Sequence, residues 1–376
     1  MIARSDGPAR TVALFLPSLA GGGAEQVFVE LANEFAARGL QVDLVLGSAK
    51  GPCLGDVSSA VHIIDCNATR ILRALPPLVR YLRSARPAAM LSGLDHANVV
   101  AVLARRLAGG ATRCVISMRS VPTEVYSRDG SGGSRLLLRI MKVAFRFADA
   151  IVANSHAVAL DLSRLLRIPV DEIDVIHNPL NLARIEAESR APLAHDWLAE
   201  GAPPIVLGVG SLAPLKDFAT LIRAFAIVRS RRPCRLVILG DGPERERLLA
   251  LAKQAGIADD VLMPGYTPNP FAWMRHADVF VSSSLTEGCP NALMQALALG
   301  MAIVSTNAVG GSSEILENGR WGRLVPVDRP GAMAAAIGEC LDAGANPRAR
   351  ERAADFSHER VARQYLDLLL RGETPA

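Results

Sequence analysis

Two successive series of short apolar runs, separated by segments of helix length, constrain the fold of this chain more than any other feature. The first series extends from residue 11 to 179 and the second from 203 to 327. Such alternation is typical of parallel βαβ units. The sequence therefore predicts an α/β fold of two doubly wound Rossmann-like domains that face each other across a cleft, with ligands at the carboxyl ends of the strands. The expected strands are 11–17, 40–47, 61–65, 88–93, 113–118, 150–155 and 174–179, then 203–212, 235–240, 259–265, 278–284, 302–307 and 322–327.

The domain boundaries follow from a break between these series, where periodicity is lost and prolines occur. We expect residues 1–182 to form an N-terminal domain and 183–355 a C-terminal domain. Residues 356–376 are expected to form a helix that packs back on the N-terminal domain. A length of 376 residues exceeds one ordinary hydrophobic core and suits two.

The composition excludes several classes of protein. Half of the residues are hydrophobic, which excludes a mainly disordered chain, and the net charge of +4 does not indicate nucleic-acid binding. No uninterrupted apolar run of about 18 residues occurs, and the first apolar run is too short for a secretion signal, so a cytoplasmic location is expected. The six cysteines are scattered without Cys-x-x-Cys pairs, which indicates reduced, buried thiols: Cys53, Cys66, Cys114, Cys234, Cys289 and Cys340.

A glycine-rich turn, Gly21-Gly22-Gly23-Ala24-Glu25, follows the first expected strand and precedes a helix. Free backbone N–H groups at a helix N-terminus attract anions, and glycine lets a phosphate or sugar approach the main chain. The turn is neither a G-x-G-x-x-G fingerprint nor a P-loop. A glycine turn without a ligand remains the alternative.

A second candidate lies where Gly208-Val209-Gly210 ends a strand and Lys216 precedes a helix expected to begin near Asp217. A lysine at that place can reach a diphosphate as a compact positive charge. Taken alone the signal is weak, because exposed lysines are usually solvated.

The third candidate is LTEGCPNALMQALALG, residues 285–300. Pro290 suits a first helical turn, the N–H groups of Asn291 and Ala292 can receive a phosphate, and Glu287 can accept hydrogen bonds from sugar hydroxyls. Gln295 lies one turn after Asn291 on the same helix face. The alternative is an acid that merely stabilises a helix N-terminus, with Gln295 on a polar stripe.

The three motifs, in this order on two Rossmann-like domains, resemble family 4 of the retaining glycosyltransferases, which have the GT-B fold. The resemblance covers nearly the whole chain. It implies a donor nucleotide held mainly by the C-terminal domain and an acceptor held by the N-terminal one. The implied donor-binding residues are Gly22, Gly23, Ser211, Lys216, Tyr266, Glu287, Gly288, Cys289, Asn291, Ala292 and Gln295.

Three positions depart from the family pattern. The family usually has Glu where Gln295 stands, so ribose binding is expected to be weaker, because an amide lacks the charge. Many members have Arg where this chain has Ser211, and many have His in the position of Met118-Arg119-Ser120. Arg119 is therefore a candidate to supply the missing positive charge, and Glu287, Lys216 and Arg119 are the candidate catalytic residues.

The mechanism that the resemblance implies needs no metal ion or other cofactor. Sugar transfer builds negative charge on the leaving diphosphate, and Lys216 with two helix N-termini can stabilise that charge. No Asp-x-Asp motif occurs in the sequence. Retention without a carboxylate nucleophile favours front-face attack, in which the leaving phosphate takes the acceptor proton.

The expected acceptor is a lipid-linked saccharide in polysaccharide or glycan biosynthesis. Residues 70–87 and 134–148 are basic and apolar, which is typical of helices that lie on a membrane surface. An ordinary solvated helix face is the alternative. His96, at an expected strand end, and Arg119 are acceptor-side candidates, and a capping histidine is the other interpretation of His96.

The predicted function is thus transfer of a hexose or N-acetylhexosamine from a nucleotide sugar, with a UDP-sugar favoured over a GDP-sugar. The alternatives are another GT-B enzyme that uses sugar nucleotides, such as an epimerase, a glycosyl phosphorylase, or a catalytically weak two-lobed binding protein. A phosphorylase would carry a lysine-bound pyridoxal phosphate, and a two-lobed binding protein would leave Lys216 together with Glu287 unexplained.

Overall fold

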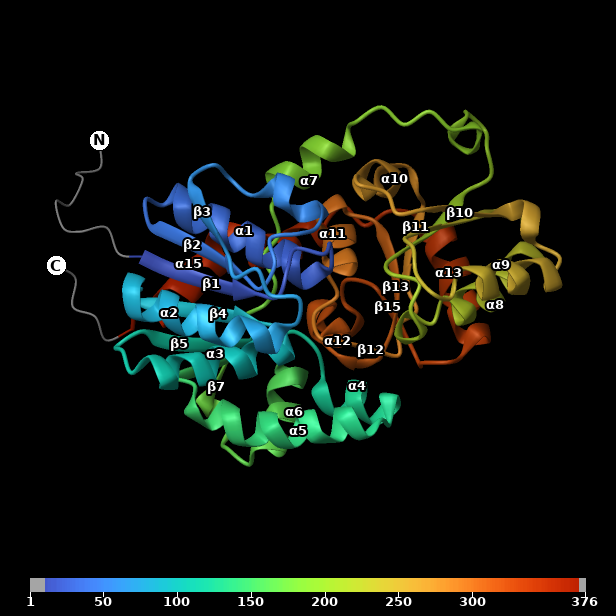
Figure 1. The fold of residues 1–376 in the computed structure, drawn as a ribbon. Coiled ribbons are helices and arrows are strands. Elements are labelled where there is room, and N and C mark those ends of the chain that lie inside the picture. The colour runs from blue at the N-terminus through green and yellow to red at the C-terminus, as the bar shows by residue number, and fades with distance from the viewer. Residues whose placement is uncertain (1–10, 372–376) are drawn as a thin grey trace. The chain divides into compact units, whose positions relative to one another are not determined.

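The computed structural model describes residues 11–371, which form two compact units (Figure 1). The first unit contains residues 11–179 and 358–371, and the second contains residues 180–357. Each unit is built on one fully parallel sheet with helices on both faces. The α/β fold expected from the alternating apolar runs is confirmed.

The sheet of the first unit has seven parallel strands in the order β3-β2-β1-β4-β5-β6-β7. The chain adds strands on one side of β1 and then returns to add β4 on the other side, so β1 and β4 flank the topological switch point. The strands are β1 (Thr11–Leu16), β2 (Gln41–Leu46), β3 (Val61–Asp65), β4 (Ala89–Gly93), β5 (Arg113–Met118), β6 (Ala150–Ala153) and β7 (Ile173–Val175).

Helices cover both faces of this sheet, because its central strands are apolar on both sides. In β1, Ala13 and Phe15 pack into one core and Val12, Leu14 and Leu16 into the other, all with no exposed surface. The first core is closed by α2 (Leu75–Ala85), α3 (Asp95–Ala108), α5 (Gly132–Ala144) and α6 (His156–Leu166), and the second by α1 (Gly23–Ala37) and α15 (His358–Leu369). The remaining helix of this unit, α4 (Pro122–Asp129), precedes α5.

The sheet of the second unit repeats this plan with six parallel strands in the order β10-β9-β8-β11-β13-β15. Its switch point lies between β8 and β11. The strands are β8 (Ile205–Val209), β9 (Arg235–Leu239), β10 (Val261–Gly265), β11 (Val279–Ser282), β13 (Ala302–Thr306) and β15 (Arg323–Val325). The helices are α7 (Leu182–Ser189), α8 (Phe218–Arg229), α9 (Arg245–Gln254), α10 (Pro270–His276), α11 (Asn291–Leu299), α12 (Ser312–Ile315), α13 (Pro330–Ala343) and α14 (Ala349–Ala353).

The structure differs from the sequence-based expectation in two details. A short parallel pair, β12 (Thr286–Glu287) with β14 (Val309–Gly310), was not predicted, because two-residue strands leave no periodic signal. Within residues 70–87, α2 begins only at Leu75, after a 3-10 turn (Ile71–Ala74), and Pro76 and Pro77 occupy its first turn, where a missing N–H has no cost.

Two further features concern the chain as a whole. Five of the six cysteines are buried, Cys66 is partly exposed, and all six are free thiols, as expected. Among residues 11–371, no helix is long and apolar enough to cross a membrane.

Candidate functional site

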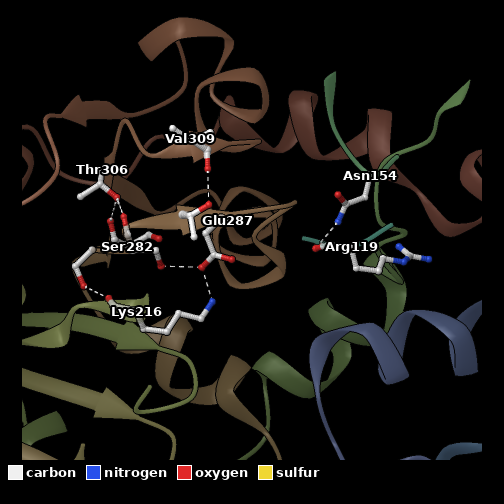
Figure 2. A network of polar contacts seen from close by, with 10 residues as sticks. Arg119, Asn154, Lys216, Ser282, Glu287, Thr306 and Val309 are labelled. Carbon is white, nitrogen blue, oxygen red and sulfur yellow. Dashed lines mark hydrogen bonds and ion pairs between the residues drawn. The ribbon is translucent and has the colours of Figure 1, made fainter. Parts of the chain in front are cut away.

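The switch point of the second unit brings Lys216 and Glu287 together. Lys216 follows β8 in a 3-10 turn, Pro214–Lys216, and Glu287 follows β11 in the short strand β12. The Lys216 ammonium donates a hydrogen bond to Oε1 of Glu287 and forms an ion pair with it, as Figure 2 shows. The Ser284 hydroxyl donates to the same oxygen at 2.7 Å. A positive charge is thus held at the sheet edge where α/β folds bind ligands.

The position of Lys216 is fixed by its backbone neighbours. Its carbonyl oxygen accepts a hydrogen bond from the Ser283 hydroxyl at 2.8 Å, and the Leu285 N–H donates to the Leu215 carbonyl at 2.8 Å. The next residue, Asp217, adopts a left-handed conformation and caps α8 by accepting from the Thr220 N–H. The helix therefore begins one residue after the predicted point, and Lys216 lies on the turn that enters it.

Glu287 is fixed by the pairing of β12 with β14. The Gly311 N–H donates to the Glu287 carbonyl, and the Thr286 hydroxyl donates to the Val309 carbonyl at 3.0 Å. Gly310 has φ of +137°, and a Cβ on it would lie 1.4 Å from the Glu287 carbonyl oxygen. Only glycine fits this close approach.

Thr306 supports the segment that precedes Glu287. Its hydroxyl donates to the Ser284 carbonyl at 2.6 Å, which ties the end of β13 to the residue that bonds the Glu287 carboxylate (Figure 2). The carboxylate is thus positioned by hydrogen bonds from the ends of two neighbouring strands.

A second close approach, which sequence reasoning missed, lies beside the Gly210 turn. Gly240, after β9, has φ of +140°, and a Cβ on it would lie 1.9 Å from the Gly210 carbonyl oxygen. The Leu212 N–H donates to the Asp241 carbonyl at 2.9 Å. The sequence Gly240-Asp241-Gly242-Pro243 at a strand end was the signal available for this contact.

The other predicted donor-binding residues of this unit lie around the start of α11 and on two exposed turns. Pro290 occupies the N-cap and not the first helical turn, so α11 begins at Asn291. Asn291, Ala292 and Gln295 are partly exposed on this helix, whereas Gly288 and Cys289 are buried. Ser211 is exposed, and Tyr266 is 58% exposed after β10.

The glycine-rich turn of the first unit is also placed at a switch point. Gly22 is the N-cap of α1, and Gly22 and Gly23 are exposed. Among residues 11–371, no side chain caps this helix. The expected order of strand, glycine-rich turn and helix is confirmed.

Arg119, at the end of β5, is held by residues of its own unit. Its guanidinium donates to Asn178 Oδ1 at 2.6 Å and to the Tyr365 hydroxyl at 3.3 Å, and it lies over the Phe28 ring at 5.3 Å. Its carbonyl accepts from the Asn154 amide (Figure 2). These contacts give Arg119 a packing role that the sequence did not indicate.

His96, the acceptor-side candidate after β4, is exposed in the first turn of α3. The N-cap of that helix is Leu94, so His96 is not the residue that caps it. The neighbouring residue Asp95, which sequence reasoning passed over, is more tightly held than His96. Its Oδ2 accepts a hydrogen bond of 2.5 Å from the Tyr126 hydroxyl.

Two family models match the chain. The model described as "Glycosyltransferase Family 4" matches residues 21–184, and the one described as "Glycosyl transferases group 1" matches residues 203–343. Together they include every candidate residue of both switch points.

Curated relatives match along nearly the full length. The lipopolysaccharide core biosynthesis glycosyltransferase LpsE of Rhizobium meliloti is 30% identical over 361 residues, covering 93% of this chain and 96% of the relative. The N-acetylgalactosamine-N,N'-diacetylbacillosaminyl-diphospho-undecaprenol 4-alpha-N-acetylgalactosaminyltransferase of Campylobacter jejuni is 28% identical over 371 residues, covering 95% and 98%.

Solved structures share the fold. Sucrose-phosphate synthase from Thermosynechococcus elongatus superposes with a TM-score of 0.79 at 21% identity, covering 96% of this chain and 98% of that one. Anabaena HepE in complex with UDP-glucose superposes with a TM-score of 0.77 at 18% identity, covering 96% and 99%. These likenesses agree with the GT-B fold expected from the sequence.

Proposed function

This chain belongs to glycosyltransferase family 4, and from that premise we propose that it moves a hexose or N-acetylhexosamine from a UDP-sugar to a lipid-linked saccharide, with retention at the anomeric carbon. The observation that carries the proposal is the Lys216–Glu287 pair at the switch point of the second unit. Family membership favours transfer over the epimerase, phosphorylase and binding-protein alternatives.

In the proposed reaction the two members of the pair serve different parts of the donor. When the donor binds, the Lys216 ammonium forms an ion pair with the diphosphate in place of Glu287. The Glu287 carboxylate then accepts hydrogen bonds from hydroxyls of the donor sugar. As the anomeric C–O bond breaks, negative charge grows on the leaving diphosphate, and Lys216 with the N–H groups of Asn291 and Ala292 stabilises it. The acceptor hydroxyl forms the new C–O bond on the same face and gives its proton to the leaving phosphate.

We propose that no metal ion takes part, because Lys216 can balance the diphosphate charge at the proposed site and the sequence has no Asp-x-Asp motif. The amides of Gly288 and Cys289 are proposed to bind the donor sugar, and Ser211, Tyr266 and Gln295 the nucleotide. The Gly22–Gly23 turn is proposed to bind phosphate. Arg119 is assigned as a positioning residue, because both guanidinium Nη atoms bond protein partners.

The direct test is calorimetry of the purified protein with UDP, GDP, ADP and their common sugars in a chelating buffer. UDP and one UDP-sugar are expected to bind at micromolar concentration without metal. Binding of GDP alone would overturn the choice of nucleotide. Absence of binding by any nucleotide would overturn the donor site.

Gln295→Glu is expected to tighten UDP binding by about 3- to 10-fold, because a carboxylate accepts stronger hydrogen bonds from ribose hydroxyls than an amide does. Calorimetry with UDP measures the change. Asn269→Asp, on the turn before α10, is the matched amide-to-acid control and is expected to leave UDP affinity unchanged. Weaker binding by Gln295→Glu would remove Gln295 from the ribose site.

The acceptor is proposed to reach the first unit from a membrane surface. On α5, Leu136, Ile140 and Val143 recur at helical spacing and are 57%, 40% and 63% exposed, although they are large and apolar. Arg135, Arg139, Lys142 and Arg146 surround them, and residues 130–148 contain no acidic side chain. An apolar stripe bordered only by cations fits an anionic lipid surface.

Val143→Glu is therefore expected to weaken binding to phosphatidylglycerol vesicles at least 10-fold. The change removes apolar surface and adds a charge that the lipid repels, each worth about 1 to 2 kcal/mol. Vesicle co-sedimentation measures it, with Leu249→Glu, at another exposed apolar side chain on α9, as the control. Equal binding by both variants would exclude this face as the membrane contact.

A further inference from the structure

The switch point of the first unit holds a carboxyl group that the proposed reaction does not use. Asp95 is the first residue of α3, and only Leu94 separates it from β4, the strand beside β1. The turn that follows β1 is the glycine-rich turn before α1. Asp95 and that turn thus lie at the carboxyl ends of the two strands that flank the switch point, the place where doubly wound folds bind their ligands.

The Asp95 side chain is held firmly through one of its oxygens. The Tyr126 hydroxyl, on α4, donates to Oδ2 at 2.5 Å. Among residues 11–371 no donor bonds the other oxygen, Oδ1, and it is not among the fully buried polar atoms that lack a partner. One oxygen is anchored and the other is open to a ligand.

Asp95 is partly buried and follows an unusual backbone conformation, neither of which the start of a helix requires. Burial raises the pKa of Asp95, whereas the Tyr126 hydrogen bond and the charge of the neighbouring His96 act to lower it. The preceding residue, Leu94, has φ of 73° and ψ of 138°, a conformation that a residue with a side chain rarely adopts. The conformation of Leu94 sets the direction in which the chain passes from β4 into α3 at Asp95.

We propose that Asp95 is an acceptor-binding residue, whose Oδ1 accepts a hydrogen bond from a hydroxyl of the acceptor saccharide while Tyr126 fixes Oδ2. The inference rests on the proposed function and extends it to a named group of the first unit. An ionised Asp95 carboxylate repels phosphate, so this position selects the saccharide and not the diphosphate of a lipid-linked acceptor. Asp95 is assigned no proton transfer.

The test is Asp95→Asn, which keeps the size of the side chain and removes its charge. The donor is the UDP-sugar that the protein is found to bind. The acceptors are short-chain polyprenyl-diphosphate mono- and disaccharides, and the rate of sugar transfer to them is measured. We expect the acceptor KM to rise about 10- to 100-fold, the loss typical of a hydrogen bond to a charged group. UDP affinity and donor hydrolysis without acceptor are expected to stay unchanged.

Two further variants separate binding from folding. Tyr126→Phe leaves the carboxyl group but removes its anchor, so a smaller rise of the acceptor KM is expected. Asp65→Asn changes a carboxylate at the end of β3, the edge strand, where its partner is the Asn67 N–H, and no kinetic change is expected. Melting temperatures show whether each variant is folded.

The outcomes distinguish a failure of the proposed function from a failure of the Asp95 assignment. Failure of the wild-type protein to bind UDP, or to transfer sugar to any of these saccharides, overturns the proposed function and Asp95 with it. Transfer with an unchanged acceptor KM in Asp95→Asn overturns the Asp95 assignment alone. If Asp95→Asn lowers both the UDP affinity and the melting temperature, Asp95 has a structural role and the acceptor-binding assignment is overturned.

Discussion

Lys216→Ala is expected to lower kcat/KM for sugar transfer by about 1,000-fold, which corresponds to about 4 kcal/mol of transition-state stabilisation. In the proposed site, the leaving diphosphate loses the lysine that stabilises its charge. In the free protein the Glu287 carboxylate, with only 13% of its side chain exposed, also loses its ion-pair partner. Steady-state kinetics with the UDP-sugar measure the first effect, and calorimetry with UDP measures the loss of donor affinity.

Two variants serve as controls for this prediction. Lys253→Ala removes an exposed lysine from α9 in the same unit and is expected to change neither quantity. Lys216→Arg retains the charge with a different shape and is expected to recover UDP binding more fully than turnover. A loss below 10-fold in Lys216→Ala would place the diphosphate elsewhere.

The parallel sheets were the part of the fold that sequence predicted well. A strand buried on both faces must be apolar throughout, as in β1, and such runs are visible without any knowledge of partners. The sequence also predicted ligands at the carboxyl ends of the strands, and the observed strand order puts the switch point of the second unit at the turns after β8 and β11. The predicted residues Lys216 and Glu287 both lie there.

The internal geometry of the site was not predictable in the same way. The Lys216–Glu287 contact joins residues 71 apart in the sequence, and each alone resembles an ordinary surface charge. The pairing of β12 with β14 depends on the close approach of Gly310, which no local pattern reports. The sequence predicted a basic and apolar helix at residues 134–148, but which of its apolar residues remain exposed depends on how α3, α4 and α6 pack against α5.

Gly310→Ala is expected to disrupt the candidate site more severely than its size suggests. The added Cβ would lie 1.4 Å from the Glu287 carbonyl oxygen, at a backbone φ of +137° that disfavours any side chain. The β12–β14 pair must therefore separate, and the Glu287 carboxylate loses the support that aims it at Lys216. We expect a cost of about 3 kcal/mol or more in unfolding free energy and a fall in melting temperature of about 6 to 12 °C.

The matched control is Gly338→Ala, in the middle of α13, where no atom of residues 11–371 lies within 4 Å of the added Cβ apart from its chain neighbours and the backbone of its own helix. A helical glycine gains stability on replacement, by up to about 1 kcal/mol, so the two alanine variants should move in opposite directions. If Gly310→Ala melts like the wild type but loses turnover, the strain is absorbed locally and Glu287 alone has moved. If it keeps both stability and turnover, the β12–β14 pair does not position Glu287. The two measurements thus separate two roles of Gly310. A loss of turnover reports its role in positioning the Glu287 carboxylate, and a lower melting temperature reports its role in stabilising the fold.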